Sequence, residues 1–137
     1  RVENEQAKQK AIDGACVAIS TNKFQAGLAE AIGSEDERIA AAWSLLTVAS
    51  ESMQAGEQAK GDKMIACAFG ILPKTSKAQK SACAPMRVMW TRDILYPLGR
   101  LEDALKCIEG ALVCDKENPD AQLIHDQLRE LVKSGSS

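Results

Sequence analysis

A turn that recurs along the chain, each time followed by small residues at the same two positions, constrains the fold more than any other feature. The three turns begin at Asn22, Gly56 and Gly99. A small residue lies five positions after the start of each turn and another lies seven positions later; these pairs are Gly27 and Ser34, Gly61 and Ala68, and Ala104 and Ala111. Because small residues allow two helices to approach closely, the pattern predicts a pair of packed helices around each turn.

The spacing of these turns predicts repeated units. The first two turns start 34 residues apart, and the second and third start 43 residues apart, which is the same unit with nine additional residues. The additional residues fall in the stretch KTSKAQKSACAP at 74–85, which we interpret as a connecting loop because it is rich in Ser and Lys. We therefore expect three two-helix units, at about 8–41, 42–75 and 85–118.

Hydrophobic periodicity and the residues at helix ends predict about seven helices and no strand. Ser34 and Glu37 have the spacing of a capping box before a helix at 37–54, which Gly56 ends. Further helices are expected at about 5–21, 24–32, 58–72, 87–96, 102–115 and 119–133. Aromatic residues make up only 4% of the chain, while all apolar residues together make up 45%, which favours an all-α fold with an aliphatic core.

A 34-residue period with two helices per unit resembles the tetratricopeptide repeat family. The third unit, GRLEDALKCIEGALVCDKENPDA, carries the resemblance most clearly. Its loop contains Gly99, and its second helix has the bulky Ile108 between the small Ala104 and Ala111. The second unit matches moderately, and the first is degenerate because Asn22 stands in place of the loop glycine.

The resemblance implies a right-handed superhelix of antiparallel helix pairs that forms a single domain over 1–133. The last helix, about 119–133, would cap this superhelix with a polar outer face, and 134–137 would be a flexible tail. Because the chain begins with Arg1 and not with Met, we also expect a fragment or a processed form.

In this family the first helix of each unit lines a concave face that usually binds a peptide or a partner helix. The resemblance places on this face Ile12, Ile19, Trp43, Leu46, Met53, Met86, Met89, Trp90, Asp93 and Tyr96. Trp, Met and aliphatic side chains suit an apolar or amphipathic segment. An alternative interpretation assigns the same apolar residues to the core, because a register shift of one residue would turn Trp43 or Trp90 inward.

The expected face lacks the Lys, Arg and Asn residues with which some family members bind acidic C-termini. The matching positions hold Ile12, Cys16, Thr47, Met86 and Trp90. The resemblance therefore implies a non-catalytic interaction module that binds an apolar helix or an extended peptide of a partner protein. The alternative is a small chaperone, similar to the type III secretion chaperones, that self-associates and shields apolar segments of several clients; a homodimer is compatible with both.

The remaining features argue against several other classes of function. A net charge of −2 and a pI of about 5.5 argue against a nucleic acid partner, and no apolar run reaches the roughly 18–20 residues that span a bilayer. The five cysteines lack metal-ligand spacing, and we expect buried thiols in an intracellular, reducing compartment such as cytoplasm or organelle stroma. His125 is the only histidine, and no nucleophile–base pair or phosphate loop is visible, so we expect no enzyme, cofactor or metal.

Overall fold

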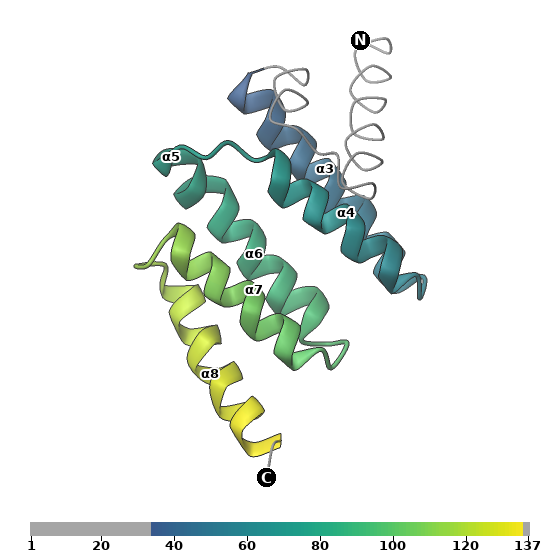
Figure 1. Ribbon diagram of the computed structural model, residues 1–137, viewed down its shortest axis with the longest axis vertical. Coiled ribbons are helices and arrows are strands. Elements are labelled where there is room, and N and C mark those ends of the chain that lie inside the picture. The colour runs from purple at the N-terminus through teal and green to yellow at the C-terminus, as the bar shows by residue number, and fades with distance from the viewer. Residues whose placement is uncertain (1–33, 136–137) are drawn as a thin grey trace. The chain divides into compact units, whose positions relative to one another are not determined.

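The computed structural model describes residues 34–135, and every regular element in this range is helical (Figure 1). The all-α prediction is confirmed there. Five helices lie in the described range, if 76–95 is taken as one, whereas about seven were expected for the chain; those expected at 5–21 and 24–32 lie outside the described residues. The chain divides into two compact units, one ending at Pro73 and one beginning at Lys74, and each is described by itself.

The first unit contains α3 (Glu35–Gln54) and α4 (Gln58–Ile71), which pack side by side as an antiparallel pair (Figure 1). α3 begins where the sequence predicts. The Ser34 Oγ atom accepts a hydrogen bond from the Glu37 backbone N–H at 3.3 Å and donates one to Glu37 Oε1 at 3.2 Å. Gly56 adopts a φ of +85°, which glycine tolerates without strain, and this conformation lets the chain reverse after α3.

α3 and α4 approach closely at one of the predicted small residues. A Cβ atom on Gly61 would lie 2.8 Å from Met53 Sδ and 3.1 Å from the carbonyl oxygen of Ala49. At the other end of the pair, the Arg38 Nε–H donates a hydrogen bond to the carbonyl oxygen of Ile71 at 3.0 Å. This bond satisfies one of the acceptors that the end of α4 leaves without an intrahelical partner, so the two helices are joined at both ends.

The second unit opens with a helix that includes most of the stretch interpreted as a loop. α5 (Ser76–Ala78), η1 (Gln79–Cys83), α6 (Ala84–Trp90) and η2 (Thr91–Leu95) follow one another without a break and are together termed the composite helix. The loop interpretation of 74–85 is therefore wrong from residue 76 onward. Small residues, which give only a weak hydrophobic periodicity, form the buried side of its first turns; they are Ala78, Ala82, Cys83 and Ala84.

Two π-helical turns, η1 and η2, interrupt the α-helical hydrogen bonding of the composite helix, and each has a local cause. Pro85 closely follows η1. It has no N–H group, and in a regular α-helix its ring would collide with the carbonyl group four residues earlier, so a wider turn removes the conflict. At the start of η2, the buried Thr91 hydroxyl donates to the carbonyl oxygen of Arg87 at 2.7 Å and competes with the backbone bonds of the helix.

α7 (Leu101–Cys114) packs against both the composite helix and α8 (Pro119–Gly135) within the second unit (Figure 1). Ala104, Ile108 and Ala111 of α7 are completely buried. The sequence predicted that these small and bulky residues form a packing surface, and they do form the buried face of α7.

The helices of the described residues begin at positions that differ in part from the expected unit bounds. Asn118 caps α8 by accepting the Ala121 N–H at 3.0 Å, which agrees with the predicted start at 119. The second and third units were expected to begin at about 42 and 85, whereas the helix pairs begin with α3 at residue 35 and with the composite helix at residue 76. Starts at 35, 76 and 119 are 41 and 43 residues apart.

None of the helices in residues 34–135 combines the length and the hydropathy that crossing a membrane requires.

Candidate binding groove

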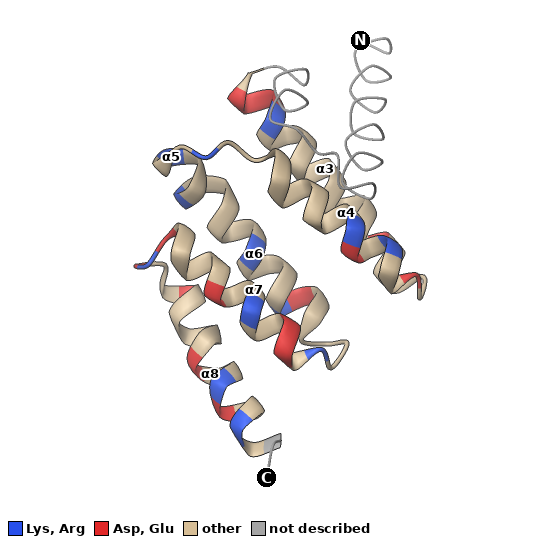
Figure 2. Cartoon of the chain, in the orientation of Figure 1, with Lys and Arg blue, Asp and Glu red and all other residues tan. Residues whose placement is uncertain are grey.

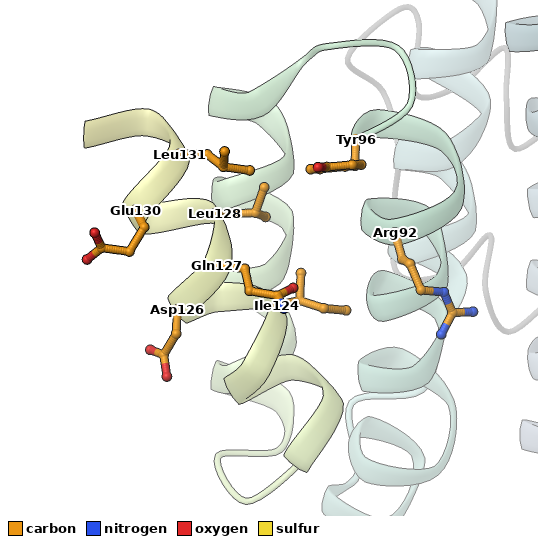
Figure 3. A pocket seen from close by; sticks show the side chains of 8 residues that line it. All are labelled: Arg92, Tyr96, Ile124, Asp126, Gln127, Leu128, Glu130 and Leu131. Atoms are coloured by element: carbon orange, nitrogen blue, oxygen red, sulfur yellow. The ribbon is translucent and has the colours of Figure 1, made fainter. Parts of the chain in front are cut away.

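An apolar groove of about 690 Å³ lies in the second unit, between the end of the composite helix and α8 (Figure 3). Such a volume is sufficient for several side chains of a bound segment. One side is formed by Arg92 of η2 and by Tyr96, the residue directly after the composite helix. The other side is formed by α8, which contributes Ile124, Asp126, Gln127, Leu128, Glu130 and Leu131. These eight residues are referred to as the groove.

The apolar wall of the groove follows from the periodicity of α8. Ile124, Leu128 and Leu131 are spaced four and three residues apart, which places them on one face of the helix. In Figure 3 these three side chains point towards Tyr96 on the opposite side. Leu128 is buried at the base with 1% exposure, whereas Leu131 and Tyr96 keep 39% and 50% of their surfaces exposed. An incoming apolar side chain would cover the exposed surfaces of both.

Three of the eight residues that line the groove are charged, Asp126 and Glu130 on α8 and Arg92 on η2. Asp126 and Glu130 point away from the apolar wall, on the solvent side of α8, where acidic and basic residues both occur (Figures 2 and 3). The Arg92 guanidinium is paired with Asp93, with Nε 3.0 Å from Oδ1 and Nη2 3.2 Å from Oδ2. This hydrogen bond and the charge of Asp93, with a smaller contribution from Asp120, raise the pKa of Arg92. Among the lining residues, the one basic group is therefore already paired, and the two carboxylates of α8 lie on the solvent side of the apolar wall.

Only part of the face expected from the sequence lies at this groove. Tyr96 lines it, and Asp93 is exposed beside it through its pair with Arg92. Met89 is half-buried and is not among the lining residues. Met86 and Trp90 are buried, with 0% and 2% exposure, so neither is available to a partner. They are four residues apart and share the inward face of the composite helix, which corrects their assignment to the binding surface.

The expected face residues of the first unit also belong largely to the core. Leu46 and Met53 are buried, and the Met53 side chain lies at the close approach of α3 and α4 beside Gly61. Trp43 is half-buried. Leu46 and Met53 are therefore buried as the core interpretation expects, and Met53 is used in the packing of α3 against α4. Two further expected face residues lie outside the described range; they are Ile12 and Ile19.

Sequence reasoning missed the contribution of α8 to the groove. This helix was interpreted as a cap with a polar outer face, yet Leu123 is 58% exposed and Leu131 is 39% exposed. The spacing of Ile124, Leu128 and Leu131 was visible in the sequence as an amphipathic pattern. This pattern is also typical of a binding surface, but the helix was interpreted as a cap at the end of the fold.

No protein-family model, curated protein or solved structure matches the chain. The resemblance to the tetratricopeptide repeat family therefore stays a prediction.

Among the described residues, no group of three or more His, Cys, Asp or Glu side chains is arranged to hold a metal ion. His125 Nε2 lies 3.7 Å from Glu109 Oε2, a contact that joins α8 to α7.

Proposed function

We propose that this protein is an interaction module that binds an amphipathic segment of a partner protein in the groove between η2 and α8. The observation that carries the proposal is the apolar wall of α8 facing a half-exposed Tyr96 across an open groove. A bound helix typically places one side chain against such a wall every three or four residues, and a bound extended segment places every second side chain against it. The proposal includes the superhelical arrangement of helix pairs that the sequence resemblance implies.

The charges at the margin define the chemistry of the proposed partner segment. Asp126 and Glu130 lie on the solvent side of α8 beside the apolar wall, where basic side chains that flank the apolar face of a bound segment would reach them, and Arg92 is already paired with Asp93. A segment with Leu, Ile or Met on one face and Lys or Arg beside that face would complement both the apolar wall and these two carboxylates. An acidic segment would meet like charges, so the proposed occupant is apolar and basic.

A chaperone for several clients is the second candidate, and one observation favours it. Val113 and Leu123 are exposed to 86% and 58% and do not line the groove, so apolar surface extends beyond a single binding site. A chaperone would bind unrelated apolar segments with similar affinity and would self-associate. Analytical ultracentrifugation and a panel of unrelated peptides therefore separate it from an adaptor that has one partner.

Fluorescence anisotropy with labelled model peptides tests the proposed binding. The probe is a Leu- and Lys-containing amphipathic peptide of about 16 residues, long enough for a bound helix of about four turns. One control peptide has the same composition in scrambled order, and another has Glu in place of Lys. We expect the amphipathic basic peptide to bind about tenfold more tightly than either control.

Variants on the same helix locate the site. Leu131→Ala and Tyr96→Ala remove exposed groove side chains, and we expect each to weaken binding of the basic peptide about tenfold. Leu123→Ala is the matched control, because Leu123 is also an exposed leucine of α8 but does not line the groove. Equal losses at Leu131 and Leu123, or binding that tolerates scrambling of the peptide, would show that the groove is not the binding site.

A further inference from the structure

Two cysteine thiols from different helices meet in the second unit. The Sγ atoms of Cys83, in η1, and Cys114, the last residue of α7, lie 2.8 Å apart. Both are free thiols in the structure. A disulfide bond has a sulfur–sulfur distance of about 2.05 Å, so the two sulfur atoms need to approach by less than about 1 Å to become bonded. The two sulfur atoms are therefore already close to bonding distance.

The surroundings of the two thiols differ in a way that allows oxidation from solvent. Cys83 is 8% exposed on the inward side of the composite helix. Cys114 is half-buried at the end of α7, just before the chain turns towards α8. A small oxidant can therefore reach Cys114 first, while Cys83 lies directly behind it, ready to attack.

We propose that Cys83 and Cys114 form a specific dithiol that is reversibly oxidised to an intramolecular disulfide by a low-molecular-weight disulfide of the glutathione class. The bond would join the end of η1 in the composite helix to the end of α7, across a separation of 31 residues. The site is independent of the groove, because neither cysteine lines it.

The reaction is two successive thiol–disulfide exchanges. The Cys114 thiol loses its proton, and its thiolate attacks one sulfur of the oxidised reagent, which releases one reduced thiol and leaves a mixed disulfide on Cys114. The Cys83 thiol then loses its proton and attacks Cys114 Sγ, which releases the second reduced thiol. In balance, two protein thiols and one external disulfide give one protein disulfide and two external thiols.

The other described cysteines are less suited to this reaction. Cys67 belongs to the first unit and is completely buried. Cys107 is 7% exposed, and its Sγ–H donates to the carbonyl oxygen of Arg87 at 3.5 Å. Burial raises the pKa of Cys107 and of Cys114 alike, so the position and accessibility of Cys114, and not its thiolate fraction, distinguish it from Cys107.

Peptide mapping of the full chain tests the assignment. The chain is equilibrated in mixtures of reduced and oxidised glutathione, blocked with N-ethylmaleimide in acid, and digested with trypsin. Cys83 then lies alone in the peptide 81–87, whereas Cys107 and Cys114 share 107–116. We expect a cross-linked pair of these peptides that persists in Cys107→Ser and is lost in Cys114→Ser. The folded chain should form this link at a glutathione ratio about a hundredfold more reducing than the urea-unfolded chain requires.

Several outcomes would overturn the proposal. A stable glutathione adduct on Cys114 without transfer to Cys83 would show that the sulfur atoms do not meet in solution. A link that survives in Cys114→Ser would assign the reactive partner to Cys107, and equal linking in folded and urea-unfolded chains would show that the fold does not prepare the bond. If Cys114→Ser proves unfolded by circular dichroism, the map of the wild-type chain together with Cys107→Ser still decides between these outcomes, because Cys114 is then the only cysteine in the peptide 107–116.

Discussion

Gly61 of α4 lies so close to Met53 of α3 that a methyl group at position 61 would meet Met53 Sδ at 2.8 Å. The same methyl group would lie 3.1 Å from the backbone oxygen of Ala49, which cannot rotate away. The distance between the two helices of the first unit is therefore set by the absence of a side chain at this position.

Gly61→Ala should destabilise the protein although alanine favours helices. The favourable propensity is about 1 kcal/mol, while overpacking of a tight helix contact costs about 1–3 kcal/mol. The matched control is Gly110→Ala in α7, where the added methyl group would meet only the Arg87 guanidinium at 2.6 Å, at the end of a long side chain. Urea unfolding followed by circular dichroism should rank Gly110→Ala above Gly61→Ala in free energy of unfolding; the reverse order would contradict the close approach.

Ser34→Ala should lower the free energy of unfolding by about 1 kcal/mol, because it removes the hydrogen bond that Ser34 Oγ accepts from the Glu37 N–H. Ser44→Ala in the middle of the same helix is the control. The exposed Ser44 hydroxyl donates back to the Ala40 carbonyl oxygen, so its loss should be neutral or slightly stabilising. Similar urea midpoints for both variants would show that Ser34 does not cap α3.

The two tryptophans should differ in their accessibility to a quencher. Trp43→Phe leaves only the buried Trp90, and Trp90→Phe leaves only the half-buried Trp43. We expect acrylamide to quench the fluorescence of Trp43 several-fold more efficiently than that of Trp90, because collisions require an exposed ring. Both should be quenched equally in concentrated urea. Equal quenching in the folded state would show that Trp90 is as exposed as Trp43, which contradicts its burial.

Alkaline pH should destabilise the reduced protein through Cys114. Burial, and then the neighbouring Cys83 thiol, raises the pKa of Cys114 from 9.0 to about 12. Between these values the unfolded chain releases the proton that the folded chain retains, so the contribution of Cys114 to stability is complete below pH 9.0 and declines towards pH about 12. The comparison is the difference in urea midpoint between wild type and Cys114→Ser under a reducing phosphine, from about pH 8 to about pH 11. This difference in urea midpoint should shrink with rising pH, and a constant difference would contradict the raised pKa of Cys114.

The helices were largely predictable where their ends carry specific chemistry. Ser34, Gly56 and Pro73 fixed the limits of the first pair, and Asn118 with Pro119 fixed the start of α8. The start of the composite helix was missed because its buried face consists of alanines and one cysteine, whose small side chains give a weak hydrophobic signal, while the Ser and Lys residues around them suggested a loop. Pro85 reinforced the error, since a proline inside a helix normally ends it.

The groove was only partly predictable. Tyr96 was assigned to the binding face from the repeat register, and it does line the groove. Met86 and Trp90 were assigned to the same face, but periodicity alone does not distinguish an apolar stripe that is buried from one that remains open. That distinction depends on which neighbouring helix covers the stripe, and this is a property of the tertiary packing.

The π-helical turn η2 determines the direction in which Tyr96 leaves the composite helix. A π turn holds one residue more than an α turn, so every side chain after it is rotated by about 100° relative to an uninterrupted α-helix. Tyr96 directly follows η2, and its ring faces the leucines of α8 with that rotation included. If the same sequence wound as an uninterrupted α-helix through 91–95, Tyr96 would point about 100° away from its present direction, so the wall opposite α8 depends on the wider turn that accommodates one extra residue.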